Sequence, residues 1–288
     1  MLIRDILKEK NKGISFEFFP PKTEEGKGAF MATVKELMIY DPLYVSVTYG
    51  AGGTTQERTY RTLKWLRDEA TDLTVMSHLT CIGATEKTID ELLRNYISIG
   101  VENILALRGD PPKGVPDFDL SKGDFKYASD LVRFIRRYNF FSIAVAVYPE
   151  GHQESPDLDM DMEYTLKKIN EGADFAITQM FFDNNFFFDF MERATKKGIM
   201  LPIIPGIMPI GDIKKITEFA RFCKATIPDW IIRRMEPFQD NPEEMKKIGI
   251  EIAVKQCMEL QDNGVKFFHF YTLNRSDMVV PILKSLIK

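Results

Sequence analysis

NILALRGD, residues 103–110, is a short apolar run that ends in a cation, a glycine and an anion. Seven further runs rich in Val, Ile, Leu or Phe occur at 14–19, 43–48, 73–80, 141–148, 174–179, 201–206 and 266–271. Segments of helical length separate them. Alternation of nearly continuous apolar strands with helices predicts a parallel sheet covered by helices. Eight such units predict a (β/α)8 barrel, the α/β fold of the TIM-barrel type.

The segments between these runs carry helix caps and apolar periodicity. Helices are predicted at 24–40, 54–69, 86–99, 124–138, 160–171, 185–197, 211–224 and 278–287, and a longer helical segment at 242–263 precedes the last strand as an addition to the plain repeat. The proline-rich segment 109–122 is predicted to form a loop or lid over the mouth of the barrel. A length of 288 residues suits one domain, residues 1–288, because a barrel takes about 250 residues.

Composition excludes several classes of function. The net charge of −4 gives no reason to expect binding to nucleic acid, which requires basic surfaces. Arg4 and Asp5 interrupt what would be the apolar part of a signal peptide, and the most apolar window, 199–210, is short and broken by prolines, so neither secretion nor a membrane span is expected. Three cysteines without CxxC spacing suggest reduced thiols and a cytoplasmic location.

Polar residues stand at the ends of the predicted strands. In a (β/α)8 barrel the active site lies at the carboxyl ends of the strands, so residues far apart in the chain are expected to meet in one pocket. The residues at these positions are Glu17, Thr48, His78, Thr80, Arg108, Asp110, Tyr148, Gln179 and Arg275.

Glu17 is a single carboxylate among aromatic residues in the segment ISFEFFPP, residues 14–21. Burial disfavours the charged form of a carboxyl group, so Glu17 is a candidate general acid. The alternative is a structural ion pair with a buried arginine or lysine. Arg275, just beyond the last strand, is suited to bind a carboxylate through two parallel hydrogen bonds.

Other motifs are weak. The segment GAGGTT, residues 50–55, follows a strand and opens a helix but lacks the P-loop lysine and the GxGxxG spacing. His78, His152 and His269 are single histidines without an HxH pair, so no metal site is expected, and His269 is predicted to pack in the core. The phenylalanines between 181 and 188 are expected to pack between helix and barrel.

Eight segments together resemble the methylenetetrahydrofolate reductase family, in the same order along the chain: SFEFFPPKT, VSVTYGAGG, HLTCIGAT, ILALRGDPP, YPEGHQES, ITQMFFD, IIPGIMPI and FHFYTLNRS. The resemblance extends from about residue 13 to about residue 285. It implies a barrel that binds a flavin at the carboxyl ends of its strands and reduces 5,10-methylenetetrahydrofolate to 5-methyltetrahydrofolate with NADH or NADPH in a ping-pong cycle. A homo-oligomer is also expected.

The resemblance assigns roles by position. It implies that Glu17 protonates the folate, that Asp110 binds the pterin and tunes the flavin, and that Gln179, Phe219 and Arg275 contact substrate. For the flavin it implies Thr48, His78, Arg108, Gly109, Asp110, Tyr127, Ala128, Tyr148, His152, Asp161, Lys167 and Lys168. FAD is the usual cofactor, but Tyr164 stands in place of an asparagine and Lys167 in place of an arginine, which leaves FMN open.

Two other readings belong to different classes. One is a pterin-binding barrel without redox activity, which needs no flavin. The other is a reductase subunit that takes electrons from a partner protein in place of a nicotinamide. Because barrels host many chemistries, the fold alone does not separate these readings from a reductase.

Overall fold

The computed structural model describes residues 1–49, 53–111 and 122–286, without the side chains of residues 53–55. In this part of the chain nine strands form one parallel sheet in the order β7-β6-β5-β4-β3-β2-β1-β9-β8. The strands are β1 (Gly13–Phe18), β2 (Tyr44–Val47), β3 (Val75–Thr80), β4 (Asn103–Leu107), β5 (Ser142–Val147), β6 (Phe175–Thr178), β7 (Ile203–Ile204), β8 (Gly206–Ile207) and β9 (Phe267–Tyr271). The predicted barrel fold is confirmed.

The predicted seventh strand, 201–206, is divided in two by Pro205. Strand β7 pairs with β6, and β8 pairs with β9, so the two halves together join the ends of the sheet. Proline has no N–H and interrupts a strand ladder. The neighbouring groups compensate, because the Pro205 carbonyl accepts from His269 N at 3.0 Å and Gly206 N donates to Thr178 Oγ1 at 2.9 Å. Nine strand segments therefore form an eight-membered barrel.

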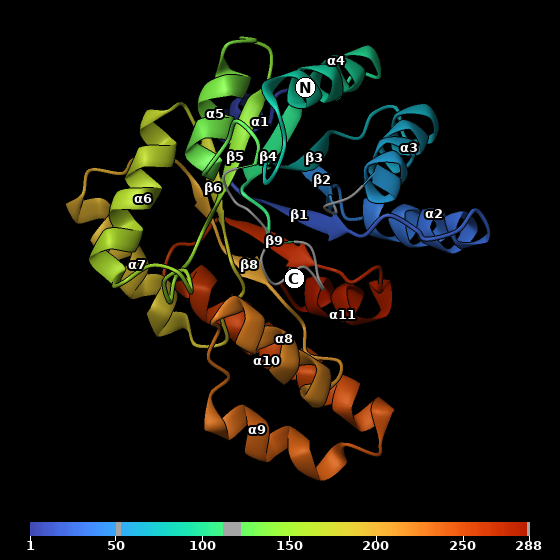
Figure 1. Ribbon diagram of the computed structural model, residues 1–288. Helices are drawn as coiled ribbons and strands as arrows, with labels where there is room; N and C mark the ends of the chain where they lie inside the picture. Colours follow the sequence, from blue (N-terminus) through green and yellow to red (C-terminus); the bar gives the residue numbers. More distant parts are fainter. Residues whose placement is uncertain (50–52, 112–121, 287–288) are drawn as a thin grey trace.

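Helices surround the sheet (Figure 1). Several begin at side-chain caps: Thr85 accepts from Thr88 N, Asp157 from Met160 N, and Asp212 from Lys215 N. The helices that follow strands are α2 (Glu25–Met38), α3 (Gly53–Glu69), α4 (Glu86–Ser98), α5 (Ala128–Arg136), α6 (Leu158–Asn170), α7 (Asn184–Lys196), α8 (Ile213–Cys223) and α11 (Ser276–Leu286).

The additional helical segment before the last strand is also confirmed, as α10 (Pro242–Asp262). Two shorter elements that were not predicted precede it, α9 (Asp229–Met235) and η1 (Glu236–Phe238). In Figure 1, α9 lies farthest from the barrel in this region. Buried side chains of α8, α9 and α10 form a second hydrophobic core that includes Ile216, Ile231 and Ile248. No helix in the described ranges is both long and apolar enough to cross a membrane.

The barrel interior has two halves. Successive strand residues point to opposite faces, so alternate residues face inward. Inward positions on β9, β1, β2 and β3 are mainly polar, and we call them the polar half: Ser15, Glu17, Tyr44, Ser46, His78, His269 and Tyr271. Beyond the polar Asn103 and Ser142 at the strand starts, inward positions on β4 to β7 form the apolar half: Leu105, Leu107, Ala144, Ala146, Phe175, Ile177 and Ile204.

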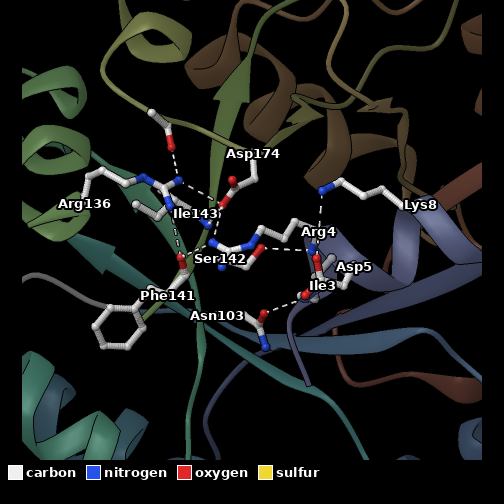
Figure 2. A network of polar contacts seen from close by, with 11 residues as sticks. Ile3, Arg4, Asp5, Lys8, Asn103, Arg136, Phe141, Ser142, Ile143 and Asp174 are labelled. Atoms are coloured by element: carbon white, nitrogen blue, oxygen red, sulfur yellow. Dashed lines mark hydrogen bonds and ion pairs between the residues drawn. The ribbon is translucent and has the colours of Figure 1, made fainter. Parts of the chain in front are cut away.

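Helix α1 (Ile3–Glu9), which was not predicted, covers the amino-terminal end of this interior. Its Ile3 and Leu7 are buried against Phe175 and neighbouring residues of the apolar half. Polar contacts fix the helix to the strand starts (Figure 2): Ile3 N donates to Asn103 Oδ1 at 2.8 Å, and Arg4 Nη1 donates to Phe141 O at 2.9 Å. The strand ends with the polar residues are therefore at the opposite end of the barrel.

Two predicted features are not described fully. The glycine-rich segment 50–55 and the proposed lid at 109–122 fall largely on residues 50–52 and 112–121, which lie outside the described ranges. The expectation of a lid therefore stays a prediction.

Candidate active site

A cavity of about 380 Å³ opens at the carboxyl ends of the strands. Residues from β1, β3, β4, β5, β6 and β9, from strand-end loops and from α8 contribute to its wall. The lining residues are Glu17, Phe19, Thr48, His78, Leu105, Leu107, Arg108, Gly109, Asp110, Ala146, Tyr148, His152, Ile177, Gln179, Met208, Phe219 and Tyr271. Ten of the residues predicted from sequence thus lie around one cavity, as expected for strand-end positions in a barrel.

Glu17 faces two histidines. Its Oε2 lies 3.4 Å from His78 Nε2 and 3.7 Å from His269 Nε2, and both nitrogens are buried without a hydrogen-bond partner in the described structure. Burial lowers the pKa of His78, although the nearby Glu17 charge opposes this change. Among the described residues, the basic side chains that face Glu17 are therefore these two histidines. The alternative of a structural pair with arginine or lysine is wrong for this part of the chain.

Arg108 leaves the end of β4 and is held by Glu154. The two guanidinium nitrogens Nη1 and Nη2 bind the two carboxylate oxygens at 2.5 and 2.7 Å. This hydrogen bonding raises the pKa of Arg108 and lowers the pKa of Glu154. Gly109 follows with φ +85°, and a side chain there would collide with Thr80. The turn after β4 therefore requires glycine, which keeps Arg108 and Asp110 at the cavity.

The wall formed by the segment just after β5 is aromatic. The rings of Tyr148 and His152 meet edge to face with centroids 4.7 Å apart, and burial raises the pKa of Tyr148 and lowers the pKa of His152. Asp161 is buried and accepts hydrogen bonds from His152 N at 2.9 Å and Ser155 Oγ at 2.7 Å. Its other oxygen, Oδ2, has no hydrogen-bond partner in the described structure.

Lys168 lies behind this wall. Its Nζ donates to Ala146 O at 2.6 Å and lies 5.7 Å from the centre of the Tyr148 ring. Burial lowers its pKa to about 8. In this conformation its ammonium group points inward toward the β5 backbone.

Five further predicted residues do not line the cavity. Tyr127 and Ala128 lie at the start of α5, and Lys167 is exposed on α6 with its Nζ 5.6 Å from the Tyr127 ring. Asp161 is buried behind His152. Arg275 is exposed and binds Asp277, with Nη2 2.9 Å from Oδ2. Its capacity to bind a carboxylate is thus used within the chain.

Sequence reasoning missed several residues of the wall. Tyr271 ends β9, and its hydroxyl donates to Thr178 O at 2.6 Å. Its place as the last inward residue of a predicted strand was the available signal. Met208 belongs to the segment that follows the break at Pro205, where the strand register could not be predicted. His269 is fully buried, as predicted, but it also faces Glu17.

The described residues contain no group of three or more His, Cys, Asp or Glu side chains arranged to hold a metal ion. The polar atoms of the cavity belong instead to a mixed set of hydroxyl, imidazole, guanidinium and carboxylate groups.

A parallel barrel with a half-buried carboxylate and a polar cavity at its carboxyl-terminal mouth defines the class, namely TIM-barrel proteins with an enzyme-type site. The family model described as methylenetetrahydrofolate reductase matches residues 2–287. The chain therefore belongs to the methylenetetrahydrofolate reductase family.

Individual relatives agree with this assignment. The chain is 38% identical over 273 residues to 5,10-methylenetetrahydrofolate reductase of Escherichia coli, a match that covers 95% of this chain and 90% of the relative. It is 38% identical over 295 residues to methylenetetrahydrofolate reductase (NADH) 1 of Arabidopsis thaliana, covering 99% of this chain and 50% of the relative. The chain thus spans about half the length of the plant relatives it matches.

Among solved structures, the fold is similar to an uncharacterized protein from Clostridium thermocellum that is described as binding two copies of 5-methyl-5,6,7,8-tetrahydrofolic acid. The TM-score is 0.69 at 16% sequence identity, and the match covers 100% of both chains. At this identity the likeness supports the fold.

Proposed function

We propose that this protein reduces 5,10-methylenetetrahydrofolate to 5-methyltetrahydrofolate with a bound flavin and with NADH or NADPH as reductant. The observation that carries the proposal is that Glu17, Asp110, Gln179 and Phe219 line one cavity in a chain of the methylenetetrahydrofolate reductase family. These four residues come from β1, the β4 loop, the β6 end and α8, so their convergence depends on the whole barrel.

The residues of the cavity fit a flavin. The Tyr148 ring offers a flat face, and Arg108 and Thr48 offer hydrogen-bond donors. His78 Nε2 is a buried nitrogen in the wall without a hydrogen-bond partner in the described structure, which is the kind of atom that a ligand satisfies. A flavin bound there would supply hydride transfer between the nicotinamide and the folate.

Glu17 would supply the proton in the folate half of the reaction. Its carboxyl group lines the cavity from β1 and is enclosed by His78 and His269. A protonated carboxyl group in this position can donate to N10 of methylenetetrahydrofolate, which opens the five-membered ring and makes the methylene carbon ready for hydride. The transfer from nicotinamide needs no such acid.

Three residues at the mouth would orient substrate. Asp110 is exposed at the rim, where its carboxylate can accept from the pterin amino group. Gln179 lines the wall, and its Oε1 is held by Met180 N at 2.9 Å, which leaves its amide NH2 directed to other partners. Phe219 is 43% exposed on α8 and offers a face for a planar ring.

The proposed roles of Arg275 and of the cofactor residues outside the cavity need contacts that the described structure does not contain. For Arg275 to bind the glutamate part of folate, it must leave Asp277. Tyr127, Ala128, Asp161, Lys167 and Lys168 would serve the phosphate or adenylate part of the cofactor, with Lys168 acting from behind the Tyr148 ring.

The test is to purify the protein, record its visible absorbance, and follow that absorbance under anaerobic conditions. We expect a flavin band that NADH or NADPH bleaches and that methylenetetrahydrofolate restores, with methyltetrahydrofolate as the product. A colourless protein that cannot be reconstituted with FAD or FMN would overturn the proposal.

The same measurement separates the other candidate functions. A second outcome is that neither NADH nor NADPH bleaches the flavin, although a chemical reductant does and methylenetetrahydrofolate then reoxidises it. This outcome would indicate a partner protein as electron donor. Binding of methyltetrahydrofolate without any flavin would indicate a pterin-binding barrel without redox activity.

A further inference from the structure

The buried side of Glu17 contains a set of contacts that the proposed reaction does not yet use. Ser15 lies two residues before Glu17 on β1, and so on the same face of the strand. Its Oγ is 2.8 Å from His269 Nδ1 and 3.2 Å from Phe268 O. His269 Nε2, on the other side of the ring, is 3.7 Å from Glu17 Oε2.

These contacts determine which nitrogen of His269 carries hydrogen. A carbonyl oxygen can only accept a hydrogen bond, so Ser15 donates its single hydroxyl hydrogen to Phe268 O. The Ser15 oxygen must then accept from His269 Nδ1. In the neutral ring this leaves Nε2 without a hydrogen, and its lone pair faces Glu17.

The ring cannot easily turn to avoid this contact. His269 is fully buried, stacks on Tyr44 with centroids 5.8 Å apart and an interplanar angle of 18°, and meets Tyr271 edge to face at 5.5 Å. A bare nitrogen facing a bare carboxylate in a buried site is repulsive, whereas one hydrogen between them forms a charge-assisted contact.

We propose that Glu17 and His269 together hold one proton, that Ser15 makes this possible by fixing the His269 tautomer, and that His269 is thus a positioning residue for the catalytic acid. The inference rests on the proposed function. When Glu17 gives the proton to the substrate nitrogen, the pair becomes a carboxylate and a neutral imidazole. It regains one proton from solvent through the mouth before the next turnover.

The other titratable groups that face Glu17 do not share this role. Burial raises the pKa of Tyr44 on β2 and of Tyr271 on β9, so both stay neutral. His78 on β3 is closer to Glu17, but it also lines the cavity and no contact in the described structure fixes its tautomer. Either ring nitrogen of His78 can therefore carry its hydrogen, whereas neutral His269 presents a bare Nε2 to Glu17.

The tautomer is tested directly by nitrogen NMR of the purified protein labelled with [15N]histidine. The His269 signals are assigned by their loss in His269→Asn. We expect a hydrogen on Nδ1 and none on Nε2 in the neutral ring, and a change to a mixture in Ser15→Ala. A neutral His269 with its hydrogen on Nε2 would overturn the proposal. This readout does not depend on flavin or activity, so it is independent of whether the proposed function holds.

The shared proton is tested by the two half-reactions over a range of pH. In His269→Asn we expect reduction of methylenetetrahydrofolate to slow by about 10- to 100-fold at neutral pH, less than the full effect of a general acid. We also expect the loss of rate with rising pH to begin at lower pH, because the carboxylate then binds its proton alone. Flavin reduction by NAD(P)H should stay within about 2-fold of wild type, because hydride transfer from nicotinamide needs no acid.

Ser46→Ala is the matched control, since Ser46 lies opposite Glu17 on the neighbouring strand β2 and the hydroxyl that it removes has no hydrogen-bond partner in the described structure. Its pH profile should equal that of wild type. Equal slowing of both half-reactions in His269→Asn, or an unshifted pH profile, would mean that His269 only packs the core. Ser15→Ala gives the same comparison with a smaller change, if His269→Asn does not fold.

Discussion

The two halves of the barrel interior differ in the polarity of their side chains. The apolar half packs Phe175 and Ile204 in one hydrophobic cluster with helix α1, while its Ile177 lies at the cavity. The polar half holds four of the buried side-chain atoms that lack hydrogen-bond partners in the described structure: Tyr44 Oη, Ser46 Oγ, His78 Nε2 and His269 Nε2. Buried unpaired polar atoms cost stability, so their concentration on one side of the barrel indicates a site for chemistry.

The largest expected effect comes from the polar half. Glu17→Gln keeps the size of the side chain but cannot donate a carboxylic proton. We expect the folate half-reaction to slow by about 10²–10⁴, with bleaching by NAD(P)H and flavin content close to wild type. Stopped-flow absorbance at the flavin band measures both rates. If both slow equally, Glu17 supports the architecture of the site and the division between the halves is wrong.

Substitutions in the apolar half should lower the free energy of unfolding. Phe175 is fully buried and meets Tyr44 edge to face with centroids 6.1 Å apart. Phe175→Ala should lower the free energy of unfolding by about 3–5 kcal/mol, and the milder Ile204→Val by about 0.5–1.5 kcal/mol. Urea unfolding measures both. A loss of activity without a loss of stability would show that the apolar half takes part in the chemistry.

A third test concerns pH and His78. Because burial lowers its pKa, the folded protein keeps His78 neutral between that lowered pKa and about 6.5, where the unfolded chain is already protonated. The unfolded state then binds more protons, so the free energy of unfolding falls with falling pH in this window, by up to about 1.4 kcal/mol per pH unit for one group.

His78→Asn should reduce this slope, measured by urea unfolding at about pH 5.5 and 7.5, two values on either side of the ordinary histidine pKa. The slope should not fall to zero, because burial also lowers the pKa of His152, and this residue contributes to the slope with the same sign. An unchanged slope in His78→Asn would contradict a neutral His78 in the folded state.

The smallest effect is expected at Ser46, whose hydroxyl is buried without a hydrogen-bond partner in the described structure. Ser46→Ala removes an unpaired polar group, so the free energy of unfolding should rise by up to about 1 kcal/mol. Ser15→Ala is the control, because it removes a hydroxyl that is hydrogen-bonded and should cost about 1 kcal/mol. A clear loss of stability in Ser46→Ala would mean that an ordered water satisfies this hydroxyl.

Much of the fold could be predicted because local patterns determine it. Apolar runs and caps gave the strands, most helices and the end of the barrel at which polar residues meet. Helix α1 and helix α9 were missed, since each is only 7 residues long and is stabilised by contacts with distant segments. The division of the seventh strand was missed for a similar reason, because the effect of Pro205 depends on its neighbours β6 and β9.

The candidate site shows the same limit. Strand-end position was enough to bring Glu17, Asp110 and Gln179 to one cavity. The position of a residue in the sequence does not determine which group a long side chain contacts. The pairing of Arg275 with Asp277 and the inward direction of Lys168 were therefore not predicted. It also could not give the second layer of contacts, in which His269 lies behind Glu17.

Helix α1 has a consequence for kinetics. By covering the amino-terminal end of the barrel, it leaves the carboxyl-terminal mouth as the route by which ligands reach Glu17. Two ligands that use one entrance and one cavity exclude each other. In a reductase of the proposed kind, an excess of folate should therefore slow the step with nicotinamide and an excess of nicotinamide the step with folate. Steady-state rates at rising concentrations of each ligand should show this mutual competitive inhibition.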